Sequence, residues 1–330
     1  MSATTPTHVD SSIPEVWAKN ILRKTKNAGF FGRFIGAEGS GKPIIQKSEL
    51  LNKPGDLIHI QVTDSLTGAG VEGDTATLEG NEENLTTSAM SVSPVLYRHA
   101  VRVNRRAQKK SIVELRGEAE FRLAEWGEHK MDDKRFSLYL ANALPAPLAG
   151  ETYAANVHSV GTTGAGASPD DIAAGEGLDV SELQKIKLKL VNQLAKPVMV
   201  DGFPTFFLVT HPNATYVLKQ DTRYEAWVRE AAERGRSNPL FRGSLAMVDG
   251  MVIFEHVYVP RAANATAVKV ASGVAFGAEA FIEGLDENVS SKTDTFDYDL
   301  EWGVSYEFAF QPRRGLEQNS LRVYAEAPDA

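Results

Sequence analysis

The sequence predicts an α+β protein that carries a long β-hairpin outside its main core. Three observations lead to this fold class. Helical and strand patterns are mixed along the chain without the regular alternation that βαβ units require. Residues 54–97 contain no lysine or arginine and are rich in glycine. A strong amphipathic helical pattern then begins near residue 111.

The composition excludes several classes of protein. The chain has 330 residues, with 35 Lys and Arg against 43 Asp and Glu, a net charge of −8 and no cysteine. The absence of cysteine excludes a disulfide scaffold, thiolate metal centres and cysteine nucleophiles. The negative charge argues against nucleic-acid binding as the role of the whole chain, since tight phosphate binding needs clustered cations. Residues 1–9 lack a signal-peptide pattern and no apolar stretch is long enough to span a bilayer, so we expect a soluble, intracellular chain without a membrane partner.

The first 53 residues predict an N-terminal arm followed by a short helix. Residues 1–10 have the composition of a disordered arm. A helix capped by Ser12 would place Trp17 and Ile21 on one apolar face.

The segment Gly36–Lys42 matches the beginning of the phosphate-binding pattern G-x-x-x-x-G-K. The next residue is Pro43, which has neither the hydroxyl that binds magnesium nor an amide N–H for a phosphate. Ile44 and Ile45 then continue as a strand rather than a helix. We interpret the segment as a flexible turn, and a nucleotide-binding enzyme that uses it is the weaker alternative.

Residues 54–103 predict an extended hairpin. Leu57–Val62 has the pattern of a strand, and Val92–Val103 that of the returning strand. The long loop between them has no apolar core of its own, so we expect it to need a partner. The seven carboxylates of the segment are Asp56, Asp64, Glu72, Asp74, Glu79, Glu82 and Glu83. Their spacing fits neither a calcium loop nor a glycosidase pair, so we predict partner-facing or solvated acids without a metal ion.

The charge changes sign directly after the hairpin. No acid occurs between residues 98 and 110, and the bases there are Arg98, Arg102, Arg105, Arg106, Lys109 and Lys110. This basic run could contact nucleic acid, form a solvated face, or pair with the acidic hairpin of another copy. We favour the last interpretation, because a patch that meets a different patch on the next copy builds larger assemblies.

A long helix is predicted after the basic run. Ser111 and Glu114 form a capping-box pattern. Leu115, Ala119 and Leu123 then share one helical face, and the pattern can continue to Leu144. Glycines at 117 and 127 are weak points of such a helix.

The remaining residues mix helices and strands. We predict a Gly-rich loop over 150–178 and helices over 179–194 and 214–220. Strands are predicted over 205–210 and over 251–254, and residues 257–259 continue the second of them. The last strands are predicted over 302–324, around a turn at 312–315. The seven histidines lack metal-binding spacing. His59 and His99 are expected as a packed pair on neighbouring strands.

Five segments resemble the major capsid proteins of tailed bacteriophages with the Hong Kong 97-type fold. They are Leu66–Asp74, Leu78–Glu83, Tyr97–Arg102, Tyr224–Trp227 and Asp249–His256. The resemblance implies an N-terminal arm and short helix over 1–53, an extended hairpin (E-loop) over 54–103 and the spine helix of a peripheral domain over 104–149. It also implies an axial domain with part of the peripheral sheet over 150–295 and C-terminal peripheral strands over 296–330. Residues 263–295 match no part of the family that we can place.

The function implied by this resemblance is structural. The family's proteins self-assemble into an icosahedral shell around double-stranded DNA, without a catalytic site or cofactor. The resemblance implies a homo-oligomer of hexamers and pentamers that forms in the host cytoplasm and encloses DNA without reading its sequence. It admits scaffolding, portal and decoration proteins as further partners. The predicted inter-subunit contacts are the basic run and the acids Glu72, Asp74, Glu79, Glu82 and Glu83; an encapsulin-like compartment shell is the alternative function.

Overall fold

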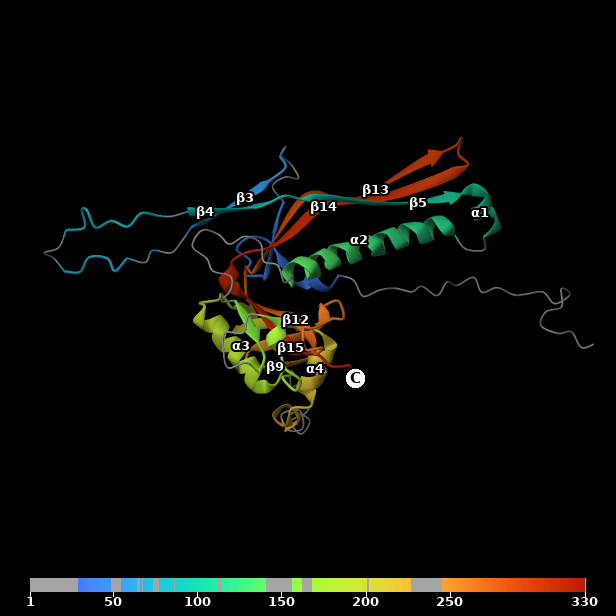
Figure 1. Ribbon diagram of the computed structural model, residues 1–330. Coiled ribbons are helices and arrows are strands. Elements are labelled where there is room, and N and C mark those ends of the chain that lie inside the picture. Colours follow the sequence, from blue (N-terminus) through green and yellow to red (C-terminus); the bar gives the residue numbers. More distant parts are fainter. Residues whose placement is uncertain are drawn as a thin grey trace, which may run out of the picture. The chain divides into compact units, whose positions relative to one another are not determined.

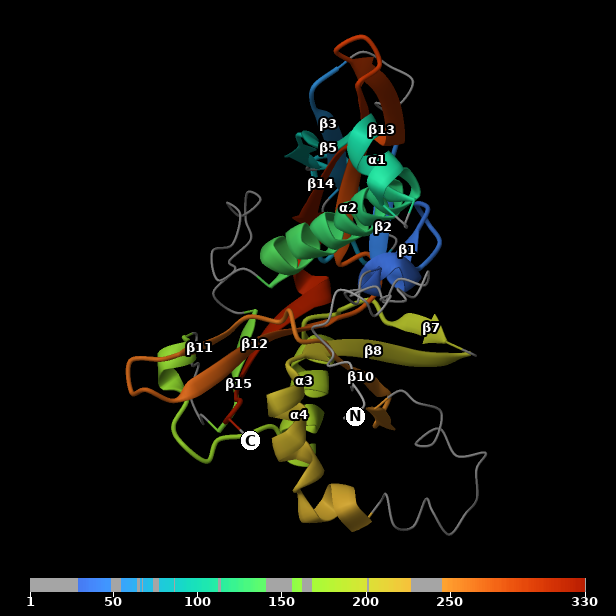
Figure 2. The same ribbon diagram turned by 90° about the vertical axis from the view of Figure 1, so that its right-hand side faces the viewer.

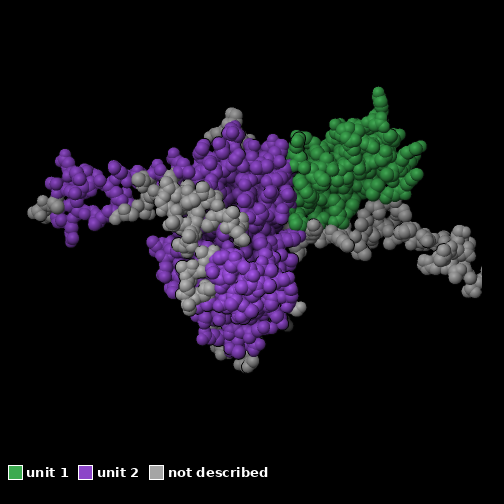
Figure 3. All heavy atoms as spheres, in the orientation of Figure 1, with its two compact units in different colours: residues 1–28, 98–129, 290–307 green, residues 29–97, 130–289, 308–330 purple. Residues whose placement is uncertain are grey.

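The computed structural model describes residues 29–48, 55–63, 66, 68–73, 77–85, 87–111, 114–140, 156–161, 168–200, 202–226 and 245–329. The chain divides into two compact units, shown in two colours in Figure 3. Unit 1 comprises residues 1–28, Arg98–His129 and Ser290–Glu307, and unit 2 comprises the rest. The predicted helix after Ser12, the predicted end of the long helix beyond Leu140 and residues 150–155 and 162–167 of the predicted Gly-rich loop over 150–178 lie outside the described residues.

A five-stranded sheet has the order β1-β2-β13-β14-β5. Its strands are β1 (Ile35–Gly36), β2 (Ile44–Lys47), β13 (Phe281–Phe296), β14 (Glu301–Arg314) and β5 (Val95–Asn104). β2 runs parallel to both β1 and β13, with Ile44 opposite Ile35 on one side and Phe281 on the other. β13 and β14 are long neighbouring strands (Figure 1).

The long helix is α2 (Leu115–Tyr139), preceded by the short helix α1 (Arg105–Lys110). The predicted start at Ser111 is wrong, because α2 begins at Leu115, whose N–H donates to the side chain of Gln108 at 2.9 Å. The predicted face is confirmed, since Ala119 and Leu123 are buried in one cluster with residues of β5 and β14.

Gly127 is not a weak point of α2 but a contact. A Cβ at this residue would lie 3.0 Å from Cδ1 of Tyr306 and closer still to its Cε1. Only a residue without a side chain lets the helix approach β14 this closely. The helix therefore runs unbroken through both glycines.

The larger sheet has eight strands and lies in unit 2. Its main path is β6-β15-β12-β8-β10-β9, with β11 beside β12 and β7 beside β8. The bounds are β6 (Val157–Ser159), β7 (Val198–Val200), β8 (Phe203–Thr210), β9 (Leu245–Val248), β10 (Met251–Glu255), β11 (Arg261–Ala263), β12 (Lys269–Phe276) and β15 (Ser320–Glu326). Figure 2 shows β8 and β10 side by side, in agreement with their parallel pairing.

β8 carries a run of four apolar residues, Phe206–Val209, because both of its faces are covered there. Phe206 and Leu208 pack in a cluster with the helices α3 (Val180–Asn192) and α4 (Pro212–Lys219). Phe207 and Val209 point into a second cluster with the 3-10 helix η1 (Phe30–Phe34). The alternation of side chains along a strand explains how neighbouring residues enter two different cores.

The predicted hairpin is present, with one error in its return. β3 (Ile58–Thr63) pairs antiparallel with β4 (Thr87–Val92), and Ile58 lies opposite Val92. The returning strand was expected over Val92–Val103, but that segment is mostly β5, which belongs to the five-stranded sheet. Pro94 separates the two strands because it has no N–H to donate to a ladder.

Three other expectations from the sequence need correction. Val257–Val259 forms a turn after β10 rather than its continuation. Pro312 lies inside β14, and the connection to β15 is Gly315 with the 3-10 helix Glu317–Asn319. His59 and His99 are not on neighbouring strands, since β3 pairs with β4 while His99 on β5 packs against Trp126.

Candidate functional site

The basic run forms the end of β5 and the whole of α1. Asn104 caps α1 by accepting the N–H of Arg106 at 2.9 Å, and the N–H of Arg105 donates to the carbonyl oxygen of Leu300 at 2.8 Å. Four bases on α1 are exposed: Arg105, Arg106, Lys109 and Lys110. None of them forms an ion pair with another described residue, so this short helix presents uncompensated positive charge.

The two bases of the run on β5 are engaged within unit 1. The guanidinium of Arg102 lies 4.0 Å from the ring centre of Phe296 and 3.4 Å from the carboxylate of Glu301. The pKa of Glu307 is lowered chiefly by a hydrogen bond from Lys292, and Arg98 contributes a weaker attraction. The basic run therefore divides into two parts. Arg98 and Arg102 on β5 interact with acids of unit 1, whereas the four bases of α1 have no ion-pair partner among the described residues.

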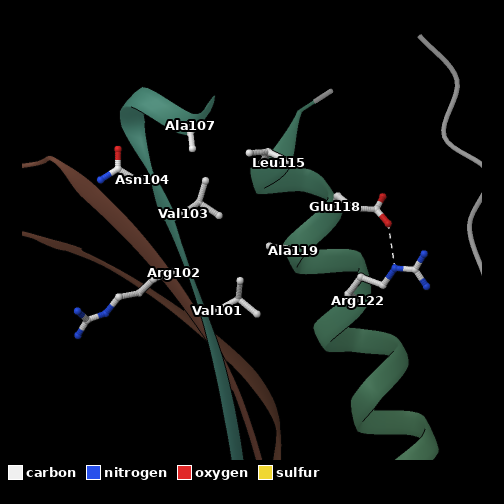
Figure 4. A pocket seen from close by; sticks show the side chains of 9 residues that line it. All are labelled: Val101, Arg102, Val103, Asn104, Ala107, Leu115, Glu118, Ala119 and Arg122. Carbon is white, nitrogen blue, oxygen red and sulfur yellow. Dashed lines mark hydrogen bonds and ion pairs between the residues drawn. The ribbon is translucent and has the colours of Figure 1, made fainter. Parts of the chain in front are cut away.

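A groove of about 590 Å³ lies beside α1 within unit 1 (Figure 4). Its lining residues are Val101, Arg102, Val103 and Asn104 of β5, Ala107 of α1, and Leu115, Glu118, Ala119 and Arg122 of α2. Most of these side chains are apolar. At its α2 edge, Arg122 pairs with Glu118 at 2.9 Å and with Glu125 at 2.8 Å. The hydrogen bond with Glu125 is the largest cause that raises the pKa of Arg122.

The described acids of the hairpin are exposed, and two of them bind its own backbone. Glu83 accepts the N–H of Gly68 across the hairpin at 2.7 Å, and Glu82 accepts the N–H of Gly80 at 2.7 Å. Glu72 and Glu79 have no such bond with a described residue, and Asp74 lies outside the described residues. The same segment carries three exposed leucines, Leu66, Leu78 and Leu85. The hairpin thus presents both negative charge and apolar side chains to its surroundings.

The predicted acids and bases belong to different compact units. The basic run lies in unit 1 and the hairpin in unit 2. The sequence alone could identify both sets, because each is a local cluster of one sign. The groove between β5 and α2 was missed, since its walls come from separate segments that only the packing of α2 on the sheet brings together.

The Gly-rich segment near residue 36 does not resemble a nucleotide site. It joins the parallel strands β1 and β2, whereas a phosphate-binding loop opens a helix. A Cβ at Gly36 would lie 2.6 Å from Cγ of Lys42, so the Lys42 side chain folds back over the turn. The prediction of a strand after Pro43 is confirmed by β2.

The described residues show neither a metal site nor a membrane-spanning helix. In the part of the chain that the structure describes, no three His, Asp or Glu side chains gather into a possible metal site. None of the helices in this part has an apolar stretch long enough to cross a bilayer.

Comparison with known proteins decides between the classes that the geometry leaves open. A family model of phage capsid proteins matches residues 13–285. The major capsid protein of Pseudomonas phage KPP25 is 30% identical over 325 residues, covering 88% of this chain and 86% of the relative. The chain belongs to the phage capsid protein family.

Solved structures agree on the fold of this capsid protein. A capsid chain of Ralstonia phage GP4 is similar over 99% of this chain and 99% of its own length, at 22% identity and a TM-score of 0.79. A cyanophage Pam1 capsid chain matches over 100% of both chains, with 16% identity and a TM-score of 0.83. The prediction of an α+β, Hong Kong 97-type fold is confirmed. The chain is a major capsid protein, a structural subunit that forms a homo-oligomeric phage shell.

One ionic cluster of this capsid protein was not visible in the sequence. Arg135 of α2 donates to Glu283 of β13 at 2.6 and 3.0 Å and to Asp132 at 3.1 Å, and all three are buried. Asp132 also accepts the N–H of Phe30 at 2.7 Å. Burial, together with the nearby charge of Glu283, raises the pKa of Tyr139, whose hydroxyl donates to Glu283. Arg135 and Glu283 are 148 positions apart, so their ion pair leaves no local signal in the sequence.

Proposed function

We propose that this capsid protein assembles into an icosahedral shell of hexamers and pentamers around a double-stranded DNA genome, in the host cytoplasm. The role is structural rather than enzymatic, and scaffolding, portal and decoration proteins are the partners expected from the family. In this proposal the hairpin of β3 and β4, the first part of the predicted segment 54–103, acts as the extended loop. Residues 104–149 act as the spine segment and residues 150–295 as the axial domain with part of the peripheral sheet. Of the predicted arm and short helix over 1–53, Phe30–Phe34 and Ile44–Lys47 belong to the folded core as η1 and β2. Residues 296–330 act as the C-terminal peripheral strands.

The acidic hairpin of one copy meets the basic run of the next copy in this assembly. The uncompensated charge of α1 supports this pairing, because four exposed bases without an ion-pair partner among the described residues favour an acidic neighbour. The hairpin supplies exposed acids with no base among residues 54–97. A patch that binds a different patch on the next copy forms a closed ring when the rotation closes.

The exposed leucines of the hairpin support the same conclusion. Leu66, Leu78 and Leu85 are 64–65% exposed in the chain taken alone. An isolated two-stranded hairpin is at best marginally stable in water, so apolar side chains at its tip favour burial against another chain. A single exposed ion pair contributes only about 0–1 kcal/mol, but a shell repeats each contact many times.

Charge reversal tests this pairing. Glu72→Lys with Glu79→Lys is the preferred hairpin variant, because Glu82 and Glu83 also hold the hairpin's own amides. Arg105→Glu with Arg106→Glu is the partner variant. We expect each pair to reduce particle yield in electron micrographs and sedimentation, and the four changes together to recover part of the loss. Added salt should weaken the differences, since the screening length is about 8 Å at physiological ionic strength.

The control reverses Asp133 and Glu225, two exposed acids outside the hairpin. It should leave the particle yield at the wild-type level. If the four-residue variant shows only the sum of the two defects, the hairpin acids and the basic run do not face each other. A wild-type chain that never forms particles would contradict shell assembly itself.

A further inference from the structure

The turn between β13 and β14 has an unusual backbone. Asp297, Tyr298 and Asp299 have φ angles of 49°, 48° and 67°, so three successive non-glycine residues lie in the left-handed region. A side chain in that region crowds the backbone, and such residues usually occur singly. Strained backbone of this kind is concentrated at functional sites. The turn therefore merits a functional explanation.

The strained turn presents an aromatic side chain to solvent. Tyr298 has a relative exposure of 103%, above that of the other exposed large apolar residues in the described part of the chain. No hydrogen bond or ring contact joins it to another described residue. Tyrosine is enriched where protein surfaces meet, because its ring adds contact area at low entropic cost. Asp297 and Asp299 place a negative charge on each side of it.

The turn lies next to the basic helix in unit 1. The N–H of Arg105 donates to the carbonyl oxygen of Leu300 at 2.8 Å, so α1 starts beside the turn. Arg102 stacks over Phe296 at the end of β13, at 4.0 Å from the ring centre. The apolar groove of Figure 4 begins at the same place, since Asn104 and Ala107 line it. One corner of unit 1 thus carries a knob, formed by Tyr298 with Asp297 and Asp299, and an apolar groove beside the basic helix α1.

We propose that Tyr298 of one copy inserts into the groove between β5, α1 and α2 of a second copy. Its ring would meet the apolar side chains of Val103, Ala107 and Leu115, which line that groove. Asp297 and Asp299 would face the bases of α1, which have no ion-pair partner among the described residues of their own copy. The turn of one copy is therefore complementary, both in charge and in apolar surface, to the groove and the basic helix of the other copy.

The placement of knob and groove determines the kind of assembly. Full exposure shows that Tyr298 does not fill the groove of its own copy. A contact in which Tyr298 of one copy enters the groove of the next is head-to-tail, and it forms a ring when the rotation between copies closes. The inference rests on the proposed shell assembly and adds a second acidic segment, besides the hairpin, that uses the basic run.

Disulfide trapping tests the contact directly, because the chain has no cysteine of its own. One variant carries Asp299→Cys, which leaves Tyr298 in place, and another carries Ala107→Cys on the groove. The two variants are expressed together, and the particles are oxidised and run on a non-reducing gel. We expect a disulfide-linked dimer of one chain of each kind. The control pairs Ala107→Cys with Tyr216→Cys, a half-exposed residue of α4, and should give no dimer.

Substitution of the aromatic anchor is the second test. Tyr298→Ala should raise the protein concentration needed for particle formation at least about tenfold, the loss typical of an interface anchor. Tyr298→Phe should assemble nearly as the wild type, since it keeps the ring. The melting temperature of the unassembled chain should not fall in either variant, because Tyr298 has no contact to lose there.

The outcomes separate this inference from the proposed function. Normal wild-type particles, no specific dimer and unchanged assembly of Tyr298→Ala would overturn the Tyr298 contact and leave shell assembly intact. Failure of the wild type to form particles would contradict both. Equal trapping in the Tyr216→Cys control would mean random collision and would also count against the contact.

Discussion

The hairpin and the eight-stranded sheet, both in unit 2, bury their residues to very different extents. In the sheet, all of β8 from Thr205 to Thr210 is buried between two clusters. In the hairpin, the buried side chains among the described residues are only Ile58, Met90 and Val92, all close to its base. The sheet is completed by its own chain. In the proposed assembly, other copies bury the side chains that the hairpin exposes.

The base of the hairpin shows where its attachment to its own chain ends. A Cβ at Gly284 of β13 would lie 2.8 Å from Cγ1 of Val92 and 3.0 Å from Cδ1 of Ile58. Arg313 of β14 donates to the carbonyl oxygen of Ser91. Glycine at 284 allows the hairpin to pack directly on β13. Beyond these contacts the described hairpin residues are exposed or partly exposed.

Removal of the hairpin tip gives the largest expected effect. A variant in which an Asn-Gly turn replaces residues 64–86 keeps β3, β4 and the contacts at the base. Two-residue turns of this type close antiparallel strands well, so the monomer should fold with a melting temperature close to that of the wild type. Particles should be absent from micrographs, because the acids and leucines of the tip are gone. Normal particles from this variant would contradict the assignment of the hairpin as an inter-subunit element.

The opposite result is expected for the buried ionic cluster on α2. Arg135→Ala should lower the free energy of unfolding by about 3–5 kcal/mol, because it leaves Glu283 and Asp132 as uncompensated buried charges. Arg135→Ala with Glu283→Ala should be less destabilising than the sum of the single changes. Urea unfolding followed by tryptophan fluorescence measures both, and Asp133→Ala on the exposed side of α2 is the matched control.

Additive losses in that double-variant cycle would contradict the role of the cluster. Hairpin variants should fold and not assemble, whereas cluster variants should fail to fold well and lose assembly as a consequence. The two sets of variants therefore separate assembly from folding.

The same contrast explains what could be predicted from the sequence. The helix over 179–194 was predicted closely, because Asp179 caps it and Leu183, Ile186 and Leu190 form one buried stripe. The acidic hairpin and the basic run were found because each is a local pattern. The return strand was misplaced, since Val92–Val103 reads as one apolar alternation although Pro94 divides it between two sheets. The groove beside α1 and the Arg135 cluster depend on contacts between distant segments, which no local pattern records.

A smaller loss of stability is expected from a change at Glu182 on α3, the helix that packs on the eight-stranded sheet. Burial alone would raise the pKa of this carboxyl, but hydrogen bonds from His158 and Lys185 outweigh it and lower the pKa to about 2. A carboxyl with a lowered pKa stabilises the fold above its usual value near 4.5, and this contribution disappears as the pH falls towards 2.

Glu182→Gln should therefore reduce the free energy of unfolding at pH 7 by about 1–3 kcal/mol. The difference from the wild type should shrink between pH 4.5 and pH 2, as measured by urea unfolding across that range. Glu225→Gln, an exposed carboxyl outside this cluster, is the control and should leave the pH profile unchanged. A difference that stayed constant down to pH 2 would mean that packing, rather than the charge of Glu182, stabilises this part of α3.

The smallest effect is expected at Lys42, an exposed base in a region held by its own chain. The segment around it is fixed by the backbone: the carbonyl oxygen of Lys42 accepts the N–H of Glu279 at 2.9 Å, and that of Pro43 accepts the N–H of Phe281 at 3.0 Å. Neither bond uses the Lys42 side chain, so Lys42→Ala should leave both the free energy of unfolding and the particle yield within error. ATP binding by the wild type, measured by calorimetry and lost in Lys42→Ala, would overturn this expectation. Loss of particles without loss of stability would instead place Lys42 in a subunit contact, as proposed for the exposed acids of the hairpin.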